Sequence, residues 1–312
     1  MTDSVPPPPP PSFEPRTPLL EREENFFRSP FLAFGFLRVC LFLLLANVIG
    51  YAVQRLSSFF AGHEVSPVSP RRLVAVELAL FAGAFSAAWI MSLLEKRPFG
   101  DYGLALPKAF GKLFWLGVLF GLAEISVVVG AMAAWGSYHF GSVALLEQQV
   151  VRWLFFWAAF FLLVGLYEEF AFRGYVQFTL SQGLGFWPAA LVLSVAFGIV
   201  HIFNLGETFA GIGGIVLTGL FWCFTLRRTG SLWFAVGMHA SFDFGETFLY
   251  SVPDSGVIFP GHLSNATLAG PAWITGGTAG PEGSIFDFVA LLLFFYLIHR
   301  LFPQSFPRQS RP

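Results

Sequence analysis

The chain has 312 residues, of which 55% are apolar, 18% aromatic and only 12% charged. Soluble domains carry about 25% charged residues, so this composition excludes an ordinary soluble domain and indicates a membrane protein. The formal net charge of -1 provides no basic surface, and we expect no nucleic-acid partner. Cys40 and Cys223 lie in separate apolar runs and are interpreted as buried small side chains rather than as a disulfide.

Residues 1–28 are predicted to form a disordered, proline-rich cytoplasmic tail. Six consecutive prolines, Pro6 to Pro11, favour an extended chain and are followed by mixed charges. The first apolar run is too long for a cleavable signal peptide and lies too far from the start. Residues 303–312 are predicted to form a second cytoplasmic tail.

Eight apolar runs fill residues 29–302, each near the roughly 20 residues that cross a bilayer as a helix. Helices are expected because lipid offers no partners for open backbone groups. The runs lie at 31–56, 73–94, 113–135, 153–175, 187–203, 210–226, 231–249 and 285–301. The sequence therefore predicts an all-α fold, a polytopic transmembrane bundle of about eight spans.

The distribution of Lys and Arg predicts the orientation of this bundle. Twelve of these residues would lie on the side of the two termini and four on the other side, which favours cytoplasmic termini. Residues 251–284 contain no Lys or Arg and are predicted to form an extracytoplasmic loop. Arg38, inside the first run, is expected to extend to the headgroups. We expect an integral protein of a bacterial inner membrane.

Two adjacent carboxylates and an arginine, Glu168, Glu169 and Arg173, close the fourth run. A charge at the centre of a bilayer costs roughly 2.5–3.5 kcal/mol, so such a group is a functional-site hypothesis by default. Arg173 lies four residues after Glu169, and on a helix the two share a face and pair. Glu168 points about 100° away and is left without a local partner.

Two histidines lie in later apolar runs, and each has a helical neighbour four residues away. His201 follows Phe197, and His239 precedes Asp243, which could orient the imidazole through its ring N–H. Taken singly, each histidine is interpreted as a structural hydrogen-bond partner. Taken together with the three charged residues of the fourth run, they predict one shared polar cavity, because each group is costly if unpaired.

Such a cavity suits hydrolysis by an activated water. Glu168 and an imidazole can share a water and take its proton as it attacks a carbonyl, while a second imidazole with Asp243 holds the oxyanion. Alternatively, Glu168, His201 and His239 could bind zinc with water in the fourth position. The spacing leaves both possibilities open, and the chain has no H-E-x-x-H motif.

These residues resemble the CPBP family, also called Abi or CAAX protease and bacteriocin-processing proteins, which includes the type II CAAX prenyl endopeptidases. Its motifs EExxxR, FxxxH and HxxxN or HxxxD occur here in order, over about residues 153–248. They correspond to Glu168-Glu169 with Arg173, to Phe197 with His201, and to His239 with Asp243. The ordered triple in apolar segments makes the resemblance specific.

The resemblance implies an intramembrane endopeptidase acting on a membrane protein or peptide, prenylated or CAAX-like in part of the family. It implies that Glu168 and His201 activate water and that His239 and Asp243 stabilise the oxyanion. It also implies that the remaining motif pair is structural: Glu169 with Arg173. Asp243 stands where eukaryotic members usually have Asn, and an ionised carboxylate is a poorer oxyanion donor. The family has been described both as metalloproteases and as glutamate proteases without metal, so zinc and no cofactor stay equal alternatives.

Other polar residues in or near the apolar runs support two rival hypotheses. A proton-coupled carrier would use buried acids, and a silent immunity or scaffold protein would keep the fold without chemistry. The residues concerned are Asn47, Glu77, Glu124 and Glu246. The predicted spans also place Glu168 and His201 one to two turns apart in depth. Either the boundary between residues 183 and 188 is wrong, or the fifth helix is short and sunk in the bundle.

Overall fold

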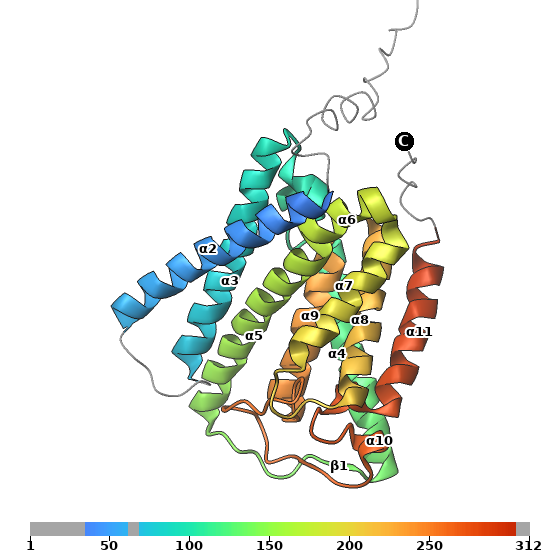
Figure 1. Ribbon diagram of the computed structural model, residues 1–312. Coiled ribbons are helices and arrows are strands. Elements are labelled where there is room, and N and C mark those ends of the chain that lie inside the picture. The colour runs from blue at the N-terminus through green and yellow to red at the C-terminus, as the bar shows by residue number, and fades with distance from the viewer. Residues whose placement is uncertain (1–34, 62–68, 304–312) are drawn as a thin grey trace, which may run out of the picture.

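The structure, a computed structural model, describes residues 35–61 and 69–303, with side chains at positions 35–57 and 69–303. The predicted tail at 1–28 lies outside the described residues, as does the tail at 303–312 apart from its first residue. Figure 1 shows the described chain as a helical bundle whose connecting loops gather at its two ends. The predicted all-α polytopic membrane fold is confirmed.

The longer helical segments follow one another in chain order. They are α2 (Gly35–Ala61), α3 (Pro70–Leu94), α4 (Lys112–Trp135), α5 (Glu147–Glu169), η3 (Phe170–Val176), α6 (Gln177–Leu184), α7 (Phe186–His201), α8 (Phe209–Thr229), α9 (Trp233–Phe244), η4 (Gly245–Tyr250) and α11 (Ile285–Leu301). Four short helical turns complete them: η1 (Phe99–Tyr102), η2 (Leu106–Lys108), α10 (Ala272–Thr275) and η5 (Pro281–Gly283). Within the described residues, strand β1 (Tyr138–His139) pairs antiparallel with strand β2 (Thr267–Leu268).

Within the described residues, five helical segments are long and apolar enough to cross a membrane. They are Gly35–Ser57, Pro70–Leu94, Lys112–Trp135, Glu147–Leu184 and Phe209–Thr229. The other three predicted runs correspond to α7, to α9 with η4, and to α11, which are shorter. Each of the eight apolar runs therefore corresponds to helix, although not every run reaches spanning length.

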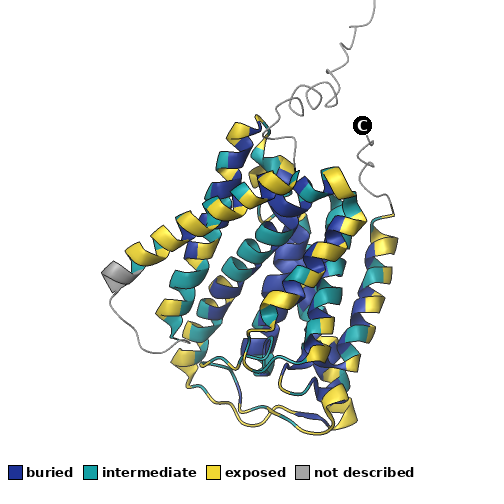
Figure 2. Cartoon of the chain, viewed as in Figure 1, coloured by how far each residue is buried: buried dark blue, intermediate teal, exposed yellow. Residues whose placement is uncertain are grey.

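Helix α9 lies inside the bundle, where it packs against α4, α5 and α8. Every residue from Trp233 to Asp243 is buried, and Figure 2 shows buried residues concentrated in the central helices and exposed ones on the outer faces. Gly117 and Gly121 of α4 let the two backbones touch. A Cβ at either position would come within 2.2 Å of a backbone oxygen of α9. Small residues at such a crossing permit the close approach that holds membrane helices together.

The difference in depth between the first two motifs is explained by the segment around residue 185. The helix of the fourth run continues through η3 and α6 to Leu184, and the chain then reverses at Gly185, whose φ is 85°. Helix α7 has only 16 residues, about 24 Å at 1.5 Å per residue, which is shorter than the roughly 30 Å apolar core of a bilayer. His201 at its end consequently lies within the bundle.

Residues 251–284 are folded rather than extended. They contain β2, α10 and η5, and in Figure 1 they lie with β1 across the end of the bundle opposite α6. The extracytoplasmic position of this loop stays a prediction. Cys223 is buried as expected, but Cys40 is exposed on α2, so its predicted burial was wrong: it lies on the side of α2 opposite buried residues such as Phe42.

Candidate active site

The first motif lies where the helix of the fourth run changes its winding. Glu168 and Glu169 are the last residues of α5, and Arg173 lies in η3, which has a wider π-helical turn. Gly174 departs from helical geometry (φ -82°, ψ -112°), and a Cβ there would come within 2.7 Å of the Phe170 ring. Such π-helical turns occur frequently at functional sites because they redirect side chains.

Arg173 pairs with Glu169, as the four-residue spacing predicted. The Arg173 Nη1 atom lies 3.2 Å from Glu169 Oε1, and both side chains are fully buried. The guanidinium also lies over the rings of Phe197, at 4.2 Å, and Trp222, at 5.2 Å. Aromatic faces attract a cation, so this arginine is held on several sides within the bundle.

His239 occupies the centre of the site and is surrounded by three carboxylates. Its Nδ1 lies 3.0 Å from Glu169 Oε1, while its Nε2 lies 3.2 Å from Asp243 Oδ2 and 3.6 Å from Glu168 Oε2. The ring stacks on Trp222 with 4.3 Å between centroids and 17° between planes. Acceptors on both ring nitrogens and a stacked indole fix the orientation of this imidazole.

His201 has a different environment at the end of α7. Its Nδ1 lies 2.7 Å from the carbonyl oxygen of Phe197. A carbonyl only accepts, so Nδ1 carries the proton and Nε2 has a free lone pair. The ring is partly exposed and packs against the Phe197 ring at 4.7 Å.

The three carboxylates around His239 differ in exposure. The Glu168 side chain is 20% exposed, against 9% for Asp243 and 0% for Glu169. Glu168 also lies within electrostatic range of His201. Water can therefore reach Glu168 and His201 more readily than it can reach Glu169 and Asp243.

The structure brings together five of the six predicted site residues: Glu168, Glu169, Arg173, His239 and Asp243. His201 stands beside this group and, within the described chain, makes no hydrogen bond to it. The Phe197 ring contacts both imidazoles, with its centroid 4.7 Å from that of His201 and 6.4 Å from that of His239.

Two further residues belong to this environment. Trp222 of α8 lies outside all three motifs, and nothing in its apolar run distinguished it from a lipid-facing tryptophan. Glu77 of α3 lies within electrostatic range of Glu168 and His239. The sequence signal that could have identified Glu77 was the presence of an acid inside an apolar run.

The predicted zinc ligands do not gather around one point. Within the described chain, the one group whose ligand atoms all lie within 4.8 Å of one another is Asp243, Glu246 and Asp254. Glu168, His201 and His239 do not form such a group, and both nitrogens of His239 face carboxylates. This arrangement does not fit a three-ligand zinc site, which needs converging donors about 2.0–2.2 Å from the ion.

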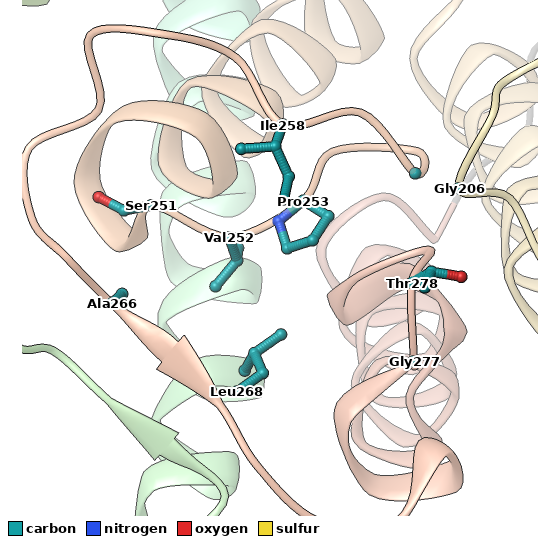
Figure 3. A pocket seen from close by; sticks show the side chains of 10 residues that line it. Gly206, Ser251, Val252, Pro253, Ile258, Ala266, Leu268, Gly277 and Thr278 are labelled. Atoms are coloured by element: carbon teal, nitrogen blue, oxygen red, sulfur yellow. The ribbon is translucent and has the colours of Figure 1, made fainter.

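One cavity lies away from these residues. It measures about 380 Å³ and is lined by the loops, including Gly206, Val252, Pro253 and Ile258. Figure 3 shows these mainly apolar side chains around it. A much smaller cavity of about 10 Å³ is lined by Trp222 and Asp243 among others, and it adjoins the site.

The arrangement of the three motifs is accompanied by a match at the level of protein families. Residues 150–245 match the family described as type II CAAX prenyl endopeptidase Rce1-like. This part of the chain is therefore similar to the Rce1-like family. This Rce1-like segment runs from α5 into η4 and contains all six predicted site residues. The comparisons with curated proteins and with solved structures gave no match.

The family assignment confirms the resemblance seen in the motifs. It supports a CAAX-type intramembrane protease at the level of the family. The match covers α5 to α9, so the helices before and after it are not part of this comparison. The roles of individual residues stay predictions.

Proposed function

We propose that this protein is an intramembrane endopeptidase that hydrolyses a peptide bond of a membrane-associated substrate, prenylated or CAAX-like in chemistry. The observation that carries the proposal is the environment of Glu168. This carboxylate is partly exposed and lacks an arginine partner within the described chain. It lies 3.6 Å from Nε2 of His239, whose other ring nitrogen is held by Glu169. A base needs that combination of access and orientation.

Glu168 and His201 activate the water in this proposal. A water between the Glu168 carboxylate and the free Nε2 of His201 is oriented toward the substrate carbonyl. Glu168 takes its proton as the new C–O bond forms, and the carbonyl electrons move to the oxygen. The same proton then passes to the amide nitrogen as the C–N bond breaks, which restores Glu168.

His239 stabilises the oxyanion in this scheme, in which the Nε2–H turns from Asp243 to the oxyanion as that charge forms. Glu169 accepts from Nδ1 and fixes the ring, as orienting carboxylates do for catalytic imidazoles. Asp243 contacts the same nitrogen that faces the substrate, so its role is to orient His239 rather than to donate. Arg173 balances the charge of Glu169.

A substrate embedded in the bilayer fits the surface near His201. The loop from α7 to α8 exposes large apolar side chains at this end of the short helix. The exposed fractions are 84% for Phe203, 104% for Leu205 and 95% for Phe209. Apolar side chains in this position favour lateral entry of a lipid-anchored or transmembrane segment over entry of a soluble peptide.

The experiment compares membrane proteomes of cells carrying the wild type or Glu168→Gln. Uncleaved precursors should accumulate in the variant, and purified wild type in liposomes should cleave the same peptides. Glu147→Gln, an exposed acid at the start of α5, is the matched control. If neither preparation cleaves anything, the carrier or the silent scaffold replaces this proposal.

Three related predictions need their own measurements. Zinc content of the purified protein, and cleavage with and without a chelator, test zinc against no cofactor. Protease protection of tags at both ends tests the cytoplasmic termini. Fractionation of the source cells tests the bacterial inner membrane.

A further inference from the structure

A second group of acids lies directly behind the proposed catalytic residues, toward the loop end of the bundle. Asp243 of α9, Glu246 of η4 and Asp254 of the following loop bring one carboxylate oxygen each within 4.8 Å of the others. All three are buried, with exposed fractions of 6%, 0% and 8%. Three buried carboxylates so close together repel one another if they are ionised, and either protons or a cation between them relieves the repulsion.

Glu246 shows that the group is incomplete. Neither of its carboxylate oxygens has a hydrogen-bond partner within the described chain, although the residue is wholly buried. Asp254, in contrast, accepts a hydrogen bond from Thr247 Oγ1 at 3.1 Å. A buried ionised carboxylate without donors is strongly disfavoured, so Glu246 either holds a proton or has a positively charged partner from outside the polypeptide.

The surroundings provide little positive charge. The charged groups that act most strongly on Glu246 are the acids Glu282, Asp254, Asp243 and Asp287. His239 acts on Asp254, but its nitrogens are already occupied by carboxylates. The loop at 251–284 contains no lysine or arginine in the sequence.

We propose that Asp243, Glu246 and Asp254 bind one hard divalent cation, Ca²⁺ or Mg²⁺. Carboxylate oxygens are the donors these ions prefer, whereas zinc prefers nitrogen and sulfur. Asp243 also lines a cavity of about 10 Å³, about the volume that one water molecule needs. The three acids share no residue with the zinc set predicted from the sequence, although Asp243 contacts one member of that set, His239.

The cation would join the loop to the catalytic helix. Asp243 contacts the Nε2 atom of His239, so an ion on its other oxygen fixes the carboxylate that orients the imidazole. Asp254 ties residues 251–284 to the same ion. The inference goes beyond peptide hydrolysis and holds whether or not the protein cleaves a substrate.

The test measures thermal unfolding of the full-length protein in detergent after chelator treatment. Millimolar CaCl2 or MgCl2 should raise the Tm of the wild type by about 5 °C, because an ion that binds only the folded state stabilises it. NaCl at equal ionic strength should not. Glu246→Gln should lose the shift and Glu147→Gln should keep it. If Glu246→Gln does not fold, Asp254→Asn serves in its place.

A direct measurement on the wild type accompanies the melts. Trp222 lines the cavity beside Asp243, so excitation of tryptophan should sensitise bound Tb³⁺, and Ca²⁺ should displace it. The proposal is overturned if divalent cations shift the Tm no more than NaCl does. It is equally overturned if Glu246→Gln responds as the wild type does, or if Tb³⁺ emission is absent.

Discussion

Two buried clusters of charge lie in this bundle, and they differ in how completely their atoms are paired. In the first, Arg38 donates through Nε to Glu95 Oε1 at 2.9 Å, and its Nη2 lies 2.6 Å from Oε2. Tyr175 and Tyr102 donate to the same carboxylate at 2.5 and 3.3 Å. Every oxygen of Glu95 is used, and the cluster joins α2, α3, η1 and η3.

The cluster around His239 is paired only in part. Glu169 Oε2 and two nitrogens of Arg173, Nε and Nη2, have no hydrogen-bond partner within the described chain. Glu168 is partly exposed and has no guanidinium beside it. A cluster in which both carboxylate oxygens are paired holds helices together, whereas the cluster around His239 keeps one carboxylate, Glu168, partly exposed and accessible to water.

The largest expected effect comes from Glu168→Gln. Cleavage should fall about 10²–10⁴-fold, because the amide cannot take a proton from water. The Tm should stay close to that of the wild type, since Glu168 is partly exposed and its contact with His239 is long, at 3.6 Å. Cleavage in liposomes and a thermal melt measure both. Unchanged cleavage would remove Glu168 from the mechanism.

Glu95→Gln should have the opposite effect, a large loss of stability rather than of catalysis. The variant leaves Arg38 buried without its counter-charge, which costs about 3–5 kcal/mol of unfolding free energy. The matched control is Asp101→Asn, whose pair with Arg97 is half-exposed and 3.9 Å long and should contribute about 0–1 kcal/mol. Denaturant unfolding in detergent measures the difference. Equal losses would show that the first cluster is not structural.

Trp222→Leu should have a smaller effect, on the orientation of His239. Stacking of aromatic rings contributes about 0.5–1.5 kcal/mol, so kcat should fall by up to about tenfold. Trp222→Phe, which keeps a ring, should restore most of it. A leucine variant as active as the wild type would mean that the stack does not position the imidazole.

The smallest effect concerns pH and the loop end of the bundle. Burial, with Asp243 nearby, raises the pKa of Glu282 to about 8 from an ordinary 4.5. The contribution of Glu282 to the free energy of unfolding is then complete below about pH 4.5 and is lost as the pH rises through about 8. In chelator, the Tm of the wild type should decline across that range. Glu282→Gln should decline less, and an identical decline would contradict the assignment.

Residues close in sequence could be paired before the structure was known. The Glu169–Arg173 and His239–Asp243 pairs follow from 3.6 residues per helical turn, which fixes neighbours four positions apart wherever the helix lies. The apolar runs likewise predicted the helices, because lipid permits little else. One local inference was wrong: Arg38 does not extend to the headgroups but is 1% exposed and paired with Glu95.

Contacts between distant segments were decided by tertiary packing alone. Glu169 and His239 are 70 positions apart, and the close crossing of α9 with its neighbours brings them together. The stack of Trp222 on His239 has the same origin. Amino-acid sequence determined that titratable groups enter the membrane and which helix each belongs to. The depth and rotation of those helices, set by glycine contacts and by the reversal at Gly185, decided which groups meet.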